Sequence, residues 1–408
     1  MTPRRLFISV AEQSADEHAA ALIRAFRQRV PRAVFAGLAG PAMRAAGCET
    51  FHDMTVRSAM ALAAVRRVPE ALWLLHRLKA YLAEGRFDAA VMVDSPTLNL
   101  PIARLCRRRG IPVLYYIAPQ TWAWASWRNA KVRRRVNRVA CIWPFEEPYF
   151  RGQGIPATYV GHPSFDRLLV QEFDEARVAE FRARGSPVVT LLPGSRAHVI
   201  REVFPGQLEV AAALKKRFPR ARFLVVPAND EMRRLIETIL GASAPVKDIE
   251  VPAGDDPTGA QAENAVAALR AAAIKAADLV LVASGTVTLE VAYHGTPMIV
   301  MYNASRWMYE LVGRRLISTP HLSIPNILAG REVVAEFMPY YRTVEPITAR
   351  AAEWLETPAT LARIRRELGE VIRPIVKPGA AANAAAELAA LLENADTRPP
   401  AGRSDSLY

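Results

Sequence analysis

The sequence predicts an α/β protein with two doubly wound parallel-sheet domains that face each other across a cleft. Short apolar runs rich in valine, isoleucine and leucine alternate with segments of helical spacing, which is typical of parallel strands buried on both faces. Several of these runs end in a glycine, serine or aspartate turn that leads into a helix. The pattern occurs in both halves of the chain, whose 408 residues exceed the usual length of one domain.

The composition describes a globular and strongly basic chain. Hydrophobic residues make up 51% and charged residues 23%, and the formal net charge is +13. This charge predicts attraction to nucleic acid, anionic lipid headgroups or phosphorylated substrates, and it does not separate them. The sequence has no run of 18 apolar residues, so we predict a cytoplasmic chain without a membrane span. Cys48, Cys106 and Cys141 lie in apolar contexts and are expected to be buried free thiols.

The first half contains five predicted strands. They are expected at residues 6–10, 34–38, 89–93, 113–118 and 139–143. Ser14 followed by Glu17 fits a capping box, which predicts that a helix starts at Ser14. Leucines at helical spacing predict a second helix over residues 69–84.

Candidate catalytic carboxylates follow two of these strands. Asp94 directly follows residues 89–93, and Glu12 and Asp16 follow residues 6–10. Ligands of open parallel sheets bind at the carboxyl ends of the strands, so we expect these side chains to face a ligand. For Asp94 the alternative role is to cap the following helix.

An aromatic and basic segment follows the strand at residues 113–118. It contains the tryptophans Trp122, Trp124 and Trp127 and then the basic residues Arg128, Lys131, Arg134 and Arg135. Aromatic residues leading into a basic amphipathic helix are typical of a membrane-interface element. The alternative is a tryptophan-lined loop packed on the core, followed by a helix with a solvated basic face. No nucleic-acid fold signature accompanies the charge, so nucleic acid is not an expected partner.

The second half repeats the strand–turn–helix pattern at residues 188–192, 223–227, 279–283 and 298–302. Two of its turns predict an anion site at the start of a helix. One is formed by Gly194, Ser195 and Arg196, and the other by Ser284, Gly285 and Thr286. Glu290 lies one helical turn beyond Thr286, where a carboxylate accepts hydrogen bonds from vicinal sugar hydroxyls. Together they predict a nucleotide-sugar pocket; the alternative is a plain tight turn and a solvated glutamate.

These patterns divide the chain into four parts. We expect one domain at residues 1–170 and a second, which carries the predicted nucleotide-sugar pocket, at residues 171–345. Residues 346–395 are alanine-rich and are expected to be helical. Residues 396–408 have the composition of a disordered tail.

Six pieces of the chain match a known family in their order. They are residues 116–124 (YIAPQTWAW), 143–146 (WPFE), 160–163 (VGHP), 192–196 (LPGSR), 283–290 (ASGTVTLE) and 323–334 (SIPNILAGREVV). Through them, residues 6–355 resemble the lipid-A-disaccharide synthases, which are inverting glycosyltransferases of the two-domain GT-B type. The resemblance implies transfer of 2,3-diacylglucosamine from its UDP derivative to the 6-hydroxyl of 2,3-diacylglucosamine 1-phosphate, with release of UDP.

The resemblance also implies roles for individual residues. Asp94 would be the general base, and Glu12 is the second candidate. The two glycine–serine turns, with Arg196, would take the diphosphate charge, Glu290 would bind the ribose, and Asn326 would lie in the donor pocket. No metal and no other cofactor is implied, because enzymes of this architecture hold the diphosphate with helix ends and basic side chains.

The expected partners follow from the acyl chains of both substrates. The aromatic and basic segment would draw the enzyme onto the anionic inner leaflet, as a peripheral protein on the cytoplasmic face of the inner membrane. The resemblance further suggests that residues 1–170 face the acceptor and the membrane and that residues 171–345 bind the UDP-sugar. It also suggests a homodimer, in which the helices of residues 346–395 cross back or are exchanged. Ala11 and Ala15 stand where the family has glycines, which keeps open a related transferase with a different UDP-sugar or lipid acceptor. A catalytically inactive nucleotide-binding relative at the membrane surface is the third reading.

Overall fold

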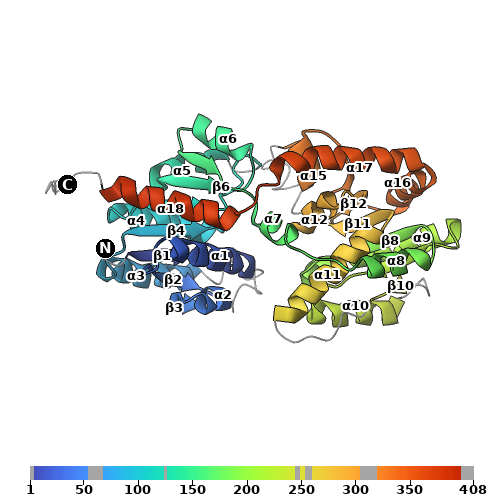
Figure 1. Cartoon of the computed structure of the whole chain (residues 1–408), viewed down its shortest axis with the longest axis horizontal. Helices are drawn as coiled ribbons and strands as arrows, with labels where there is room; N and C mark the ends of the chain where they lie inside the picture. The colour runs from blue at the N-terminus through green and yellow to red at the C-terminus, as the bar shows by residue number, and fades with distance from the viewer. Residues whose placement is uncertain are drawn as a thin grey trace. The chain divides into compact units, whose positions relative to one another are not determined.

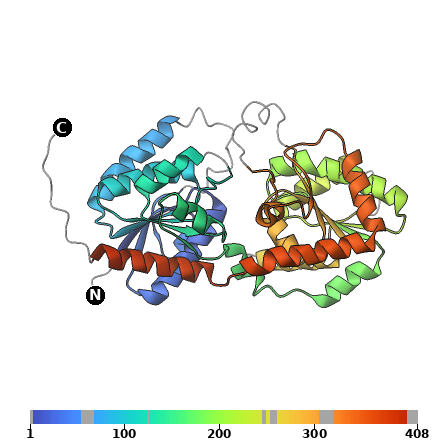
Figure 2. The same ribbon diagram turned by 90° about the horizontal axis from the view of Figure 1, so that it is seen from above.

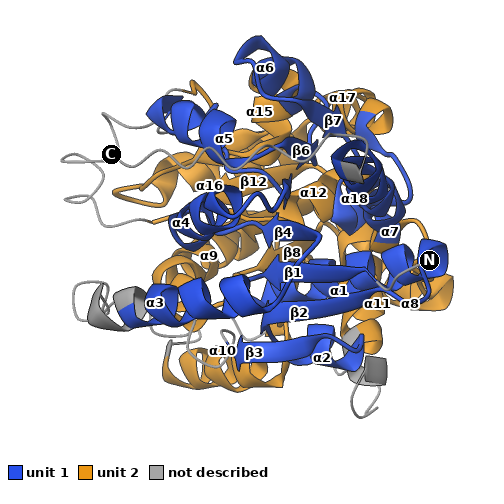
Figure 3. Cartoon of the chain, turned by 90° about the vertical axis from the view of Figure 1, so that its left-hand side faces the viewer, with its two compact units in different colours: residues 1–166, 375–408 blue, residues 167–374 orange. Residues whose placement is uncertain are grey.

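The computed structural model describes residues 4–53, 68–123, 126–243, 249–252, 260–303 and 319–396. The chain divides into two compact units, each built around one parallel sheet (Figure 1). Unit 1 comprises residues 1–166 and 375–408, and unit 2 comprises residues 167–374 (Figure 3). The prediction of an α/β fold with two doubly wound parallel sheets is confirmed.

The sheet of unit 1 has the strand order β3-β2-β1-β4-β5-β6-β7, and all neighbouring strands are parallel. Its strands are β1 (Arg5–Ser9), β2 (Val34–Ala39), β3 (Glu49–Asp53), β4 (Ala89–Val93), β5 (Val113–Tyr116), β6 (Arg138–Cys141) and β7 (Ala157–Tyr159). The order reverses between β1 and β4, which pair with each other. The carboxyl ends of these two strands therefore flank the switch point, where open parallel sheets bind ligands.

Helices cover both faces of this sheet. They are α1 (Gln13–Arg29), α2 (Pro41–Ala45), α3 (Val68–Glu84), α4 (Pro96–Arg108), α5 (Asn129–Arg135), α6 (Glu146–Gly152), α7 (Pro163–Leu168) and α18 (Ala380–Asp396). The short 3-10 helix η2 (Ser126–Arg128) precedes α5. Helices α1 and α18 pack together on one face, and α3, α4 and α5 lie on the other (Figure 2). The sheet is apolar on both faces for this reason.

Unit 2 has a six-stranded parallel sheet in the order β10-β9-β8-β11-β12-β13. Its strands are β8 (Val188–Leu192), β9 (Arg222–Val225), β10 (Ile249–Glu250), β11 (Leu279–Ala283), β12 (Met298–Met301) and β13 (Ala335–Phe337). Strands β8 and β11 pair in register from Val189 and Leu279 onward, and the order reverses between them. The turns that follow these two strands are thus neighbours at one edge of the sheet.

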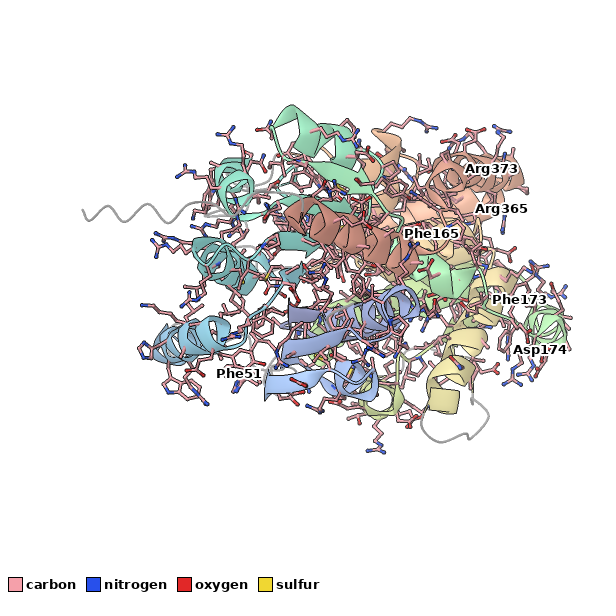
Figure 4. The ribbon with its side chains drawn as sticks, turned by 60° about the vertical axis from the view of Figure 1, so that its left-hand side comes forward. Phe51, Phe165, Phe173, Asp174, Arg365 and Arg373 are labelled. Carbon is pink, nitrogen blue, oxygen red and sulfur yellow. The ribbon has the colours of Figure 1, made fainter. Side chains whose placement is uncertain are left out.

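The helices of unit 2 surround this sheet. They are α8 (Glu175–Ala183), α9 (Ala197–Arg217), α10 (Asp230–Ser243), α11 (Ala260–Ala276), α12 (Val287–Tyr293), α15 (Ile324–Ala329), α16 (Glu345–Glu356) and α17 (Pro358–Ile372). Helix α17 is attached to the unit through Arg365, whose guanidinium donates to the carbonyl oxygen of Ala277 at 3.3 Å (Figure 4).

The last helix of the chain belongs to unit 1. The 3-10 helix η4 (Arg373–Ile375) leads from α17 toward α18, which packs on α1, β5 and β6. Glu387 accepts hydrogen bonds from Arg138 at 2.8 Å and from Thr158 at 3.2 Å, and Asp166 accepts one from the backbone of Gly379 at 2.6 Å. The stretch Pro358–Ala395 has a window of mean hydropathy 1.2, enough to cross a membrane by length and composition alone. Here it forms two packed helices rather than one rod.

Two local predictions in the first βα turn are wrong. Helix α1 begins at Gln13 with Glu12 at the N-cap and no side-chain cap, so Ser14 and Glu17 do not form a capping box. Asp16 does not face a ligand. Its buried carboxylate accepts hydrogen bonds from the backbone of Gly40, Ala42 and Met43 at 2.8, 2.8 and 3.2 Å, which caps α2. By contrast, the three cysteines are buried and free, as predicted.

Candidate active site

Asp94 lies at the carboxyl end of β4 in a strained backbone. Its φ is 53°, and the following Ser95 has a φ of 45°, two consecutive left-handed residues without glycine. Asn99 donates to the carbonyl oxygens of Val93 at 2.9 Å and of Asp94 at 2.8 Å. Tyr115 donates to the same Asp94 oxygen at 2.7 Å. The backbone that presents the Asp94 side chain is therefore fixed by two buried groups that sequence reasoning had not identified.

Asn99 also joins the two strands at the switch point. The hydroxyl of Ser9, at the end of β1, donates to Oδ1 of Asn99 at 2.7 Å. Both side chains are fully buried. Since Asn99 is bonded to the ends of β1 and β4 together, it holds the loops that carry Glu12 and Asp94 in one arrangement.

Glu12 and Asp94 lie within electrostatic reach of each other. Burial raises the pKa of the Asp94 carboxyl, the backbone N–H of Ser95 lowers it, and the negative charge of Glu12 raises it again. A carboxylate with a raised pKa is a stronger base, which suits proton abstraction from a sugar hydroxyl. The helix-capping alternative is not observed for Asp94, because Ser95 occupies the N-cap of α4. The alanines beside Glu12 do not strain this loop, since neither Ala11 nor Ala15 has a positive φ.

Trp122, which is expected to face the membrane or the acceptor, is half-buried and bonded within the protein. Its indole Nε1 donates to Oε1 of the buried Glu146 at 2.9 Å, and its ring packs edge-on against Phe145 at 4.8 Å. The other carboxylate oxygen of Glu146 accepts from the backbone of Ile142 and Trp143, both at 3.2 Å. Burial raises the pKa of Glu146 to about 7, and these hydrogen bonds oppose the rise. Trp122 is thus part of the core contact that fixes the loop after β5.

The other members of the aromatic and basic segment lie further along the chain. Trp127 is 57% exposed, with the Lys131 ammonium 4.4 Å and the Arg128 guanidinium carbon 5.2 Å from its ring centroid. Trp124 lies outside the described residues. Arg134 and Arg135 are in the last turn of α5 and line a cavity with arginines of α4. The structure therefore leaves Trp127 as the exposed tryptophan of this segment among the residues it describes.

In unit 2 the two predicted anion-binding turns lie next to each other. Gly194, Ser195 and Arg196 follow β8, and Arg196 is the N-cap of the 21-residue helix α9. Gly194 has a φ of 121°, and a Cβ there would lie 2.9 Å from Cγ1 of Val199, so only glycine fits. Ser284, Gly285 and Thr286 follow the neighbouring strand β11. Apart from its two chain neighbours, no atom of the described residues lies within 4 Å of the position a Cβ would take on Gly285, so a ligand has room against this backbone.

Glu290 is oriented by a residue that sequence reasoning had missed. Nε of Arg270, on α11, donates to Oε2 of Glu290 at 2.9 Å. The Oε1 atom of Glu290 is buried and has no hydrogen-bond partner in the described structure. A hydroxyl of a bound ribose would satisfy it, since buried polar atoms in native proteins are nearly always paired. Glu290 is thus not the solvated helix residue of the alternative reading.

The side chain of Asn326 is hydrogen-bonded entirely within the protein. It is fully buried, and its Oδ1 accepts from the backbone of Val333 at 2.7 Å and of Val334 at 3.0 Å. Its Nδ2 donates to the carbonyl oxygen of Val334 and to Glu336, at 2.9 and 3.0 Å. All four of its hydrogen-bonding positions are occupied. Asn326 therefore holds the loop between α15 and β13, and its place in the donor pocket stays a prediction.

The part of the chain described here contains no group of three histidine, cysteine, aspartate or glutamate side chains placed to hold a metal ion. His162, in the VGHP piece, is buried and accepts a hydrogen bond at Nδ1 from the backbone of Ser164 at 3.1 Å. Burial, together with the nearby His18, lowers its pKa to about 3. His162 is therefore neutral and serves the turn after β7.

Comparison of the structure with solved proteins identifies the architecture. It superposes on a UDP complex of MnaA from S. aureus with a TM-score of 0.59, at 11% identity, covering 98% of this chain and 99% of that one. MurG of Acinetobacter baumannii gives a TM-score of 0.54 at 16% identity, covering 96% of this chain and 100% of that one. These likenesses establish the fold, which is the GT-B architecture of glycosyltransferases and related epimerases.

Comparison of the sequence identifies the family. A family model described as lipid-A-disaccharide synthetase matches residues 6–370. The lipid-A-disaccharide synthase of Neisseria meningitidis serogroup A is 37% identical over 364 residues, covering 88% of this chain and 91% of that protein. That of Syntrophus aciditrophicus is 35% identical over 401 residues, covering 97% of this chain and all of that protein. The chain belongs to the lipid-A-disaccharide synthase family, glycosyltransferases of lipid A biosynthesis.

Proposed function

We propose that the protein joins UDP-2,3-diacylglucosamine to 2,3-diacylglucosamine 1-phosphate, giving the β-linked lipid A disaccharide 1-phosphate and UDP. The family assignment supports a hexosyltransferase of lipid A biosynthesis, and the donor follows from the chemistry of unit 2. The observation that carries the proposal is the buried Oε1 of Glu290, which has no hydrogen-bond partner within the described chain. It lies on the helix that begins at the Ser284–Gly285–Thr286 turn, so a nucleoside diphosphate would engage both.

The proposed reaction is a single displacement at the anomeric carbon. Asp94 removes the proton from the acceptor 6-hydroxyl as that oxygen bonds to the anomeric carbon. The bond between this carbon and the diphosphate oxygen breaks at the same time, and UDP leaves with the electron pair. Arg196 and the backbone N–H groups at the starts of α9 and α12 receive the diphosphate charge. Attack opposite the leaving group inverts the configuration at the anomeric carbon.

We propose no metal or other cofactor, because the guanidinium and helix ends supply the charge that a divalent ion would otherwise supply. We further propose that the enzyme works at the cytoplasmic face of the inner membrane, since both substrates carry acyl chains. The exposed residues Trp127 and Lys131, with the half-buried Arg128 beside the Trp127 ring, support this location. The homodimer is proposed from the family resemblance, and light scattering of the purified protein tests it.

The direct test is an assay with both lipid substrates dispersed in detergent. We expect a disaccharide monophosphate and one equivalent of UDP, detected by mass spectrometry, with no loss of rate when EDTA is added. UDP release with another lipid acceptor, but no disaccharide from this pair, would assign the protein to a related transferase. Binding of UDP without any turnover would identify the protein as a catalytically inactive, nucleotide-binding relative.

A further inference from the structure

Unit 1 contains a cavity lined by five arginines. They are Arg104, Arg107, Arg108, Arg134 and Arg135, and the cavity between them measures about 510 Å³. The first three lie on α4 at spacings of three and four residues, which places them on one face of that helix. The other two lie in the last turn of α5, which packs against α4. Two helices therefore line one open cavity with arginine side chains, of which Arg135 is half-buried and the other four are exposed.

No carboxylate of the described residues pairs with the arginines of this cavity. Residues 95–145 contain ten arginines and lysines and no aspartate or glutamate. The cavity arginines form no ion pair within the described residues. Arg107 donates to Oδ1 of Asn137 at 3.1 Å, and Arg135 donates to the carbonyl oxygen of Leu100 at 3.2 Å. Burial lowers the pKa of the Arg135 guanidinium, and the charges of Arg104 and Arg134 lower it further. Like charges are thus held together at a cost.

Ordinary helix termination does not account for this arrangement. Basic residues in the last turn stabilise a helix through its dipole, and α4 and α5 both end in arginines. That effect is fully obtained when long side chains extend separately into water. It does not explain why side chains from two helices converge on one cavity. A bound anion with more than one negative charge would offset the electrostatic repulsion among these arginine side chains.

The cavity is distinct from the candidate catalytic site. Helix α4 begins beside Asp94 at the carboxyl end of β4 and runs back toward the amino ends of the parallel strands. The arginines occupy its second half and the end of α5, so they lie toward the opposite edge of the sheet from Asp94. An anion bound there would not occupy the position expected for the acceptor hydroxyl.

The surroundings of the cavity favour a lipid as the source of the anion. Trp127 precedes Arg134 by seven residues, about 10 Å along a helix axis, and it is 57% exposed. On the other side of α4, helix α3 carries Trp73, which is 52% exposed and has the Arg77 guanidinium 5.0 Å from its ring centroid. Exposed tryptophans next to basic side chains are typical of the membrane–water interface.

We propose that this five-arginine cavity is a binding site for a lipid phosphate headgroup, and that it prefers a doubly charged phosphomonoester to a singly charged phosphodiester. The guanidinium forks match the oxygens of a terminal phosphate, which offers more charge and more acceptors than a bridging one. The site would hold the α3–α4–α5 face of unit 1 on the membrane surface. The inference rests on the proposed function only in taking the partner to be a lipid surface.

Vesicle sedimentation of the full-length protein tests the proposal. Neutral phosphatidylcholine vesicles would contain either phosphatidic acid, a phosphomonoester, or phosphatidylglycerol at a fraction that gives equal surface charge. We expect at least about fivefold stronger partitioning to phosphatidic acid, since each additional charge pair at such a surface contributes about 1 kcal/mol. The variant Arg104→Gln/Arg108→Gln should lose this preference. It removes two cavity arginines and keeps Arg107 and Arg135, which make hydrogen bonds within the protein.

The matched control is Arg220→Gln/Arg234→Gln, which removes the same charge from exposed positions of unit 2. It should keep the preference for phosphatidic acid. Equal partitioning of the wild-type protein to both charged vesicles would overturn the proposal. So would an equal effect of the two double variants, because the attraction would then come from net charge alone.

Two further measurements distinguish a lipid headgroup from a soluble anion and from nucleic acid as the ligand of the cavity. Inorganic pyrophosphate binding that depends on Arg104 and Arg108, without vesicle discrimination, would make the cavity a soluble-anion site and overturn the headgroup assignment. Binding of single-stranded RNA with the same dependence would overturn it in favour of nucleic acid. A wild-type protein that makes no disaccharide in detergent would refute the proposed function alone, since the vesicle preference is measured without substrate.

Discussion

Nε of Arg270 lies 2.9 Å from Oε2 of Glu290, although the two residues come from different helices of unit 2. Their side chains are 16% and 6% exposed, so this ion pair is largely shielded from water. The contact leaves Oε1 of Glu290 as the oxygen that a ribose hydroxyl would meet. In the proposed function, Arg270 would be a positioning residue, which acts on the nucleotide through Glu290.

Replacing Arg270 should weaken binding of both UDP and uridine. We expect Arg270→Met to raise both dissociation constants about tenfold or more, measured by calorimetry. It should also lower the free energy of unfolding by roughly 3–5 kcal/mol, because it leaves a buried carboxylate unpaired. The double variant Arg270→Met/Glu290→Gln should recover stability without recovering affinity. Unchanged uridine affinity in a folded Arg270→Met protein would remove the assignment.

Replacing Arg196 should weaken the diphosphate contact alone. A hydrogen bond to a charged group contributes about 1.5–3 kcal/mol, so Arg196→Gln should raise the dissociation constant of UDP about 10- to 100-fold. Uridine, which has no phosphate, should bind as before. Arg201→Gln is the control, since Arg201 is exposed on the same helix α9. Equal losses in the two variants would indicate a general electrostatic field rather than a contact by Arg196.

Removing the carboxylate of Asp94 should abolish proton abstraction while leaving the fold intact. We expect Asp94→Asn to lower kcat about 10²- to 10⁴-fold with little change in KM. The charge of Glu12 raises the pKa of Asp94. Glu12→Gln should therefore shift the acidic limb of the pH–rate profile to lower pH while activity persists. A shift to higher pH, or loss of the limb, would favour Glu12 as the base.

Stability should depend on pH through Glu146. Burial raises its pKa from 4.5 to about 7 in the folded protein. The folded state therefore holds this proton more tightly, and the free energy of unfolding falls as pH rises from 4.5 to 7, by roughly 3 kcal/mol. Urea unfolding of wild type and Glu146→Gln across this range isolates the effect. Parallel pH dependences for the two proteins would show that Glu146 ionises normally.

The two described tryptophans of the aromatic segment should respond differently to substitution. Trp127→Ala should reduce sedimentation with anionic vesicles, because Trp127 is exposed beside Lys131. Trp122→Phe should leave sedimentation unchanged and lower the free energy of unfolding by about 1–3 kcal/mol, since it removes a donor to Glu146. If Trp122→Phe reduced sedimentation and Trp127→Ala did not, Trp122 would be the membrane contact.

The sequence was sufficient for the central strands because those strands are apolar on both faces. The strands it did not predict, β3, β7, β10 and β13, are the outer strands of the two sheets. Their sequences, ETFHD, ATY, IE and AEF, are short or polar, since an outer strand has one neighbour and is partly exposed. The apolar runs that predict a strand arise from burial on both faces. Such runs are therefore weak or missing in these outer strands.

The candidate site was predictable where a residue follows a strand, or lies one helical turn beyond such a turn as Glu290 does. Asp94, Arg196 and Ser284 stand at strand ends, and their positions could be predicted. Asn99 and Arg270 act through contacts with residues distant in the sequence, as do the arginines of the cavity. The sequence also does not show whether a polar side chain already has a hydrogen-bond partner within the protein. Trp122 and Asn326 have such partners, which are seen only in the folded chain.

The path of the chain through its two units has a consequence for synthesis. Helix α18 covers a face of the unit 1 sheet with Ala384, Leu388 and Leu392, yet it is translated after all of unit 2. At bacterial elongation rates, the ribosome needs on the order of ten to forty seconds to progress from the end of β7 to the start of α18. During that interval the nascent first unit lacks its final helix. A chain ending before residue 380 should therefore require chaperone protection or aggregate, even with every strand of both sheets present.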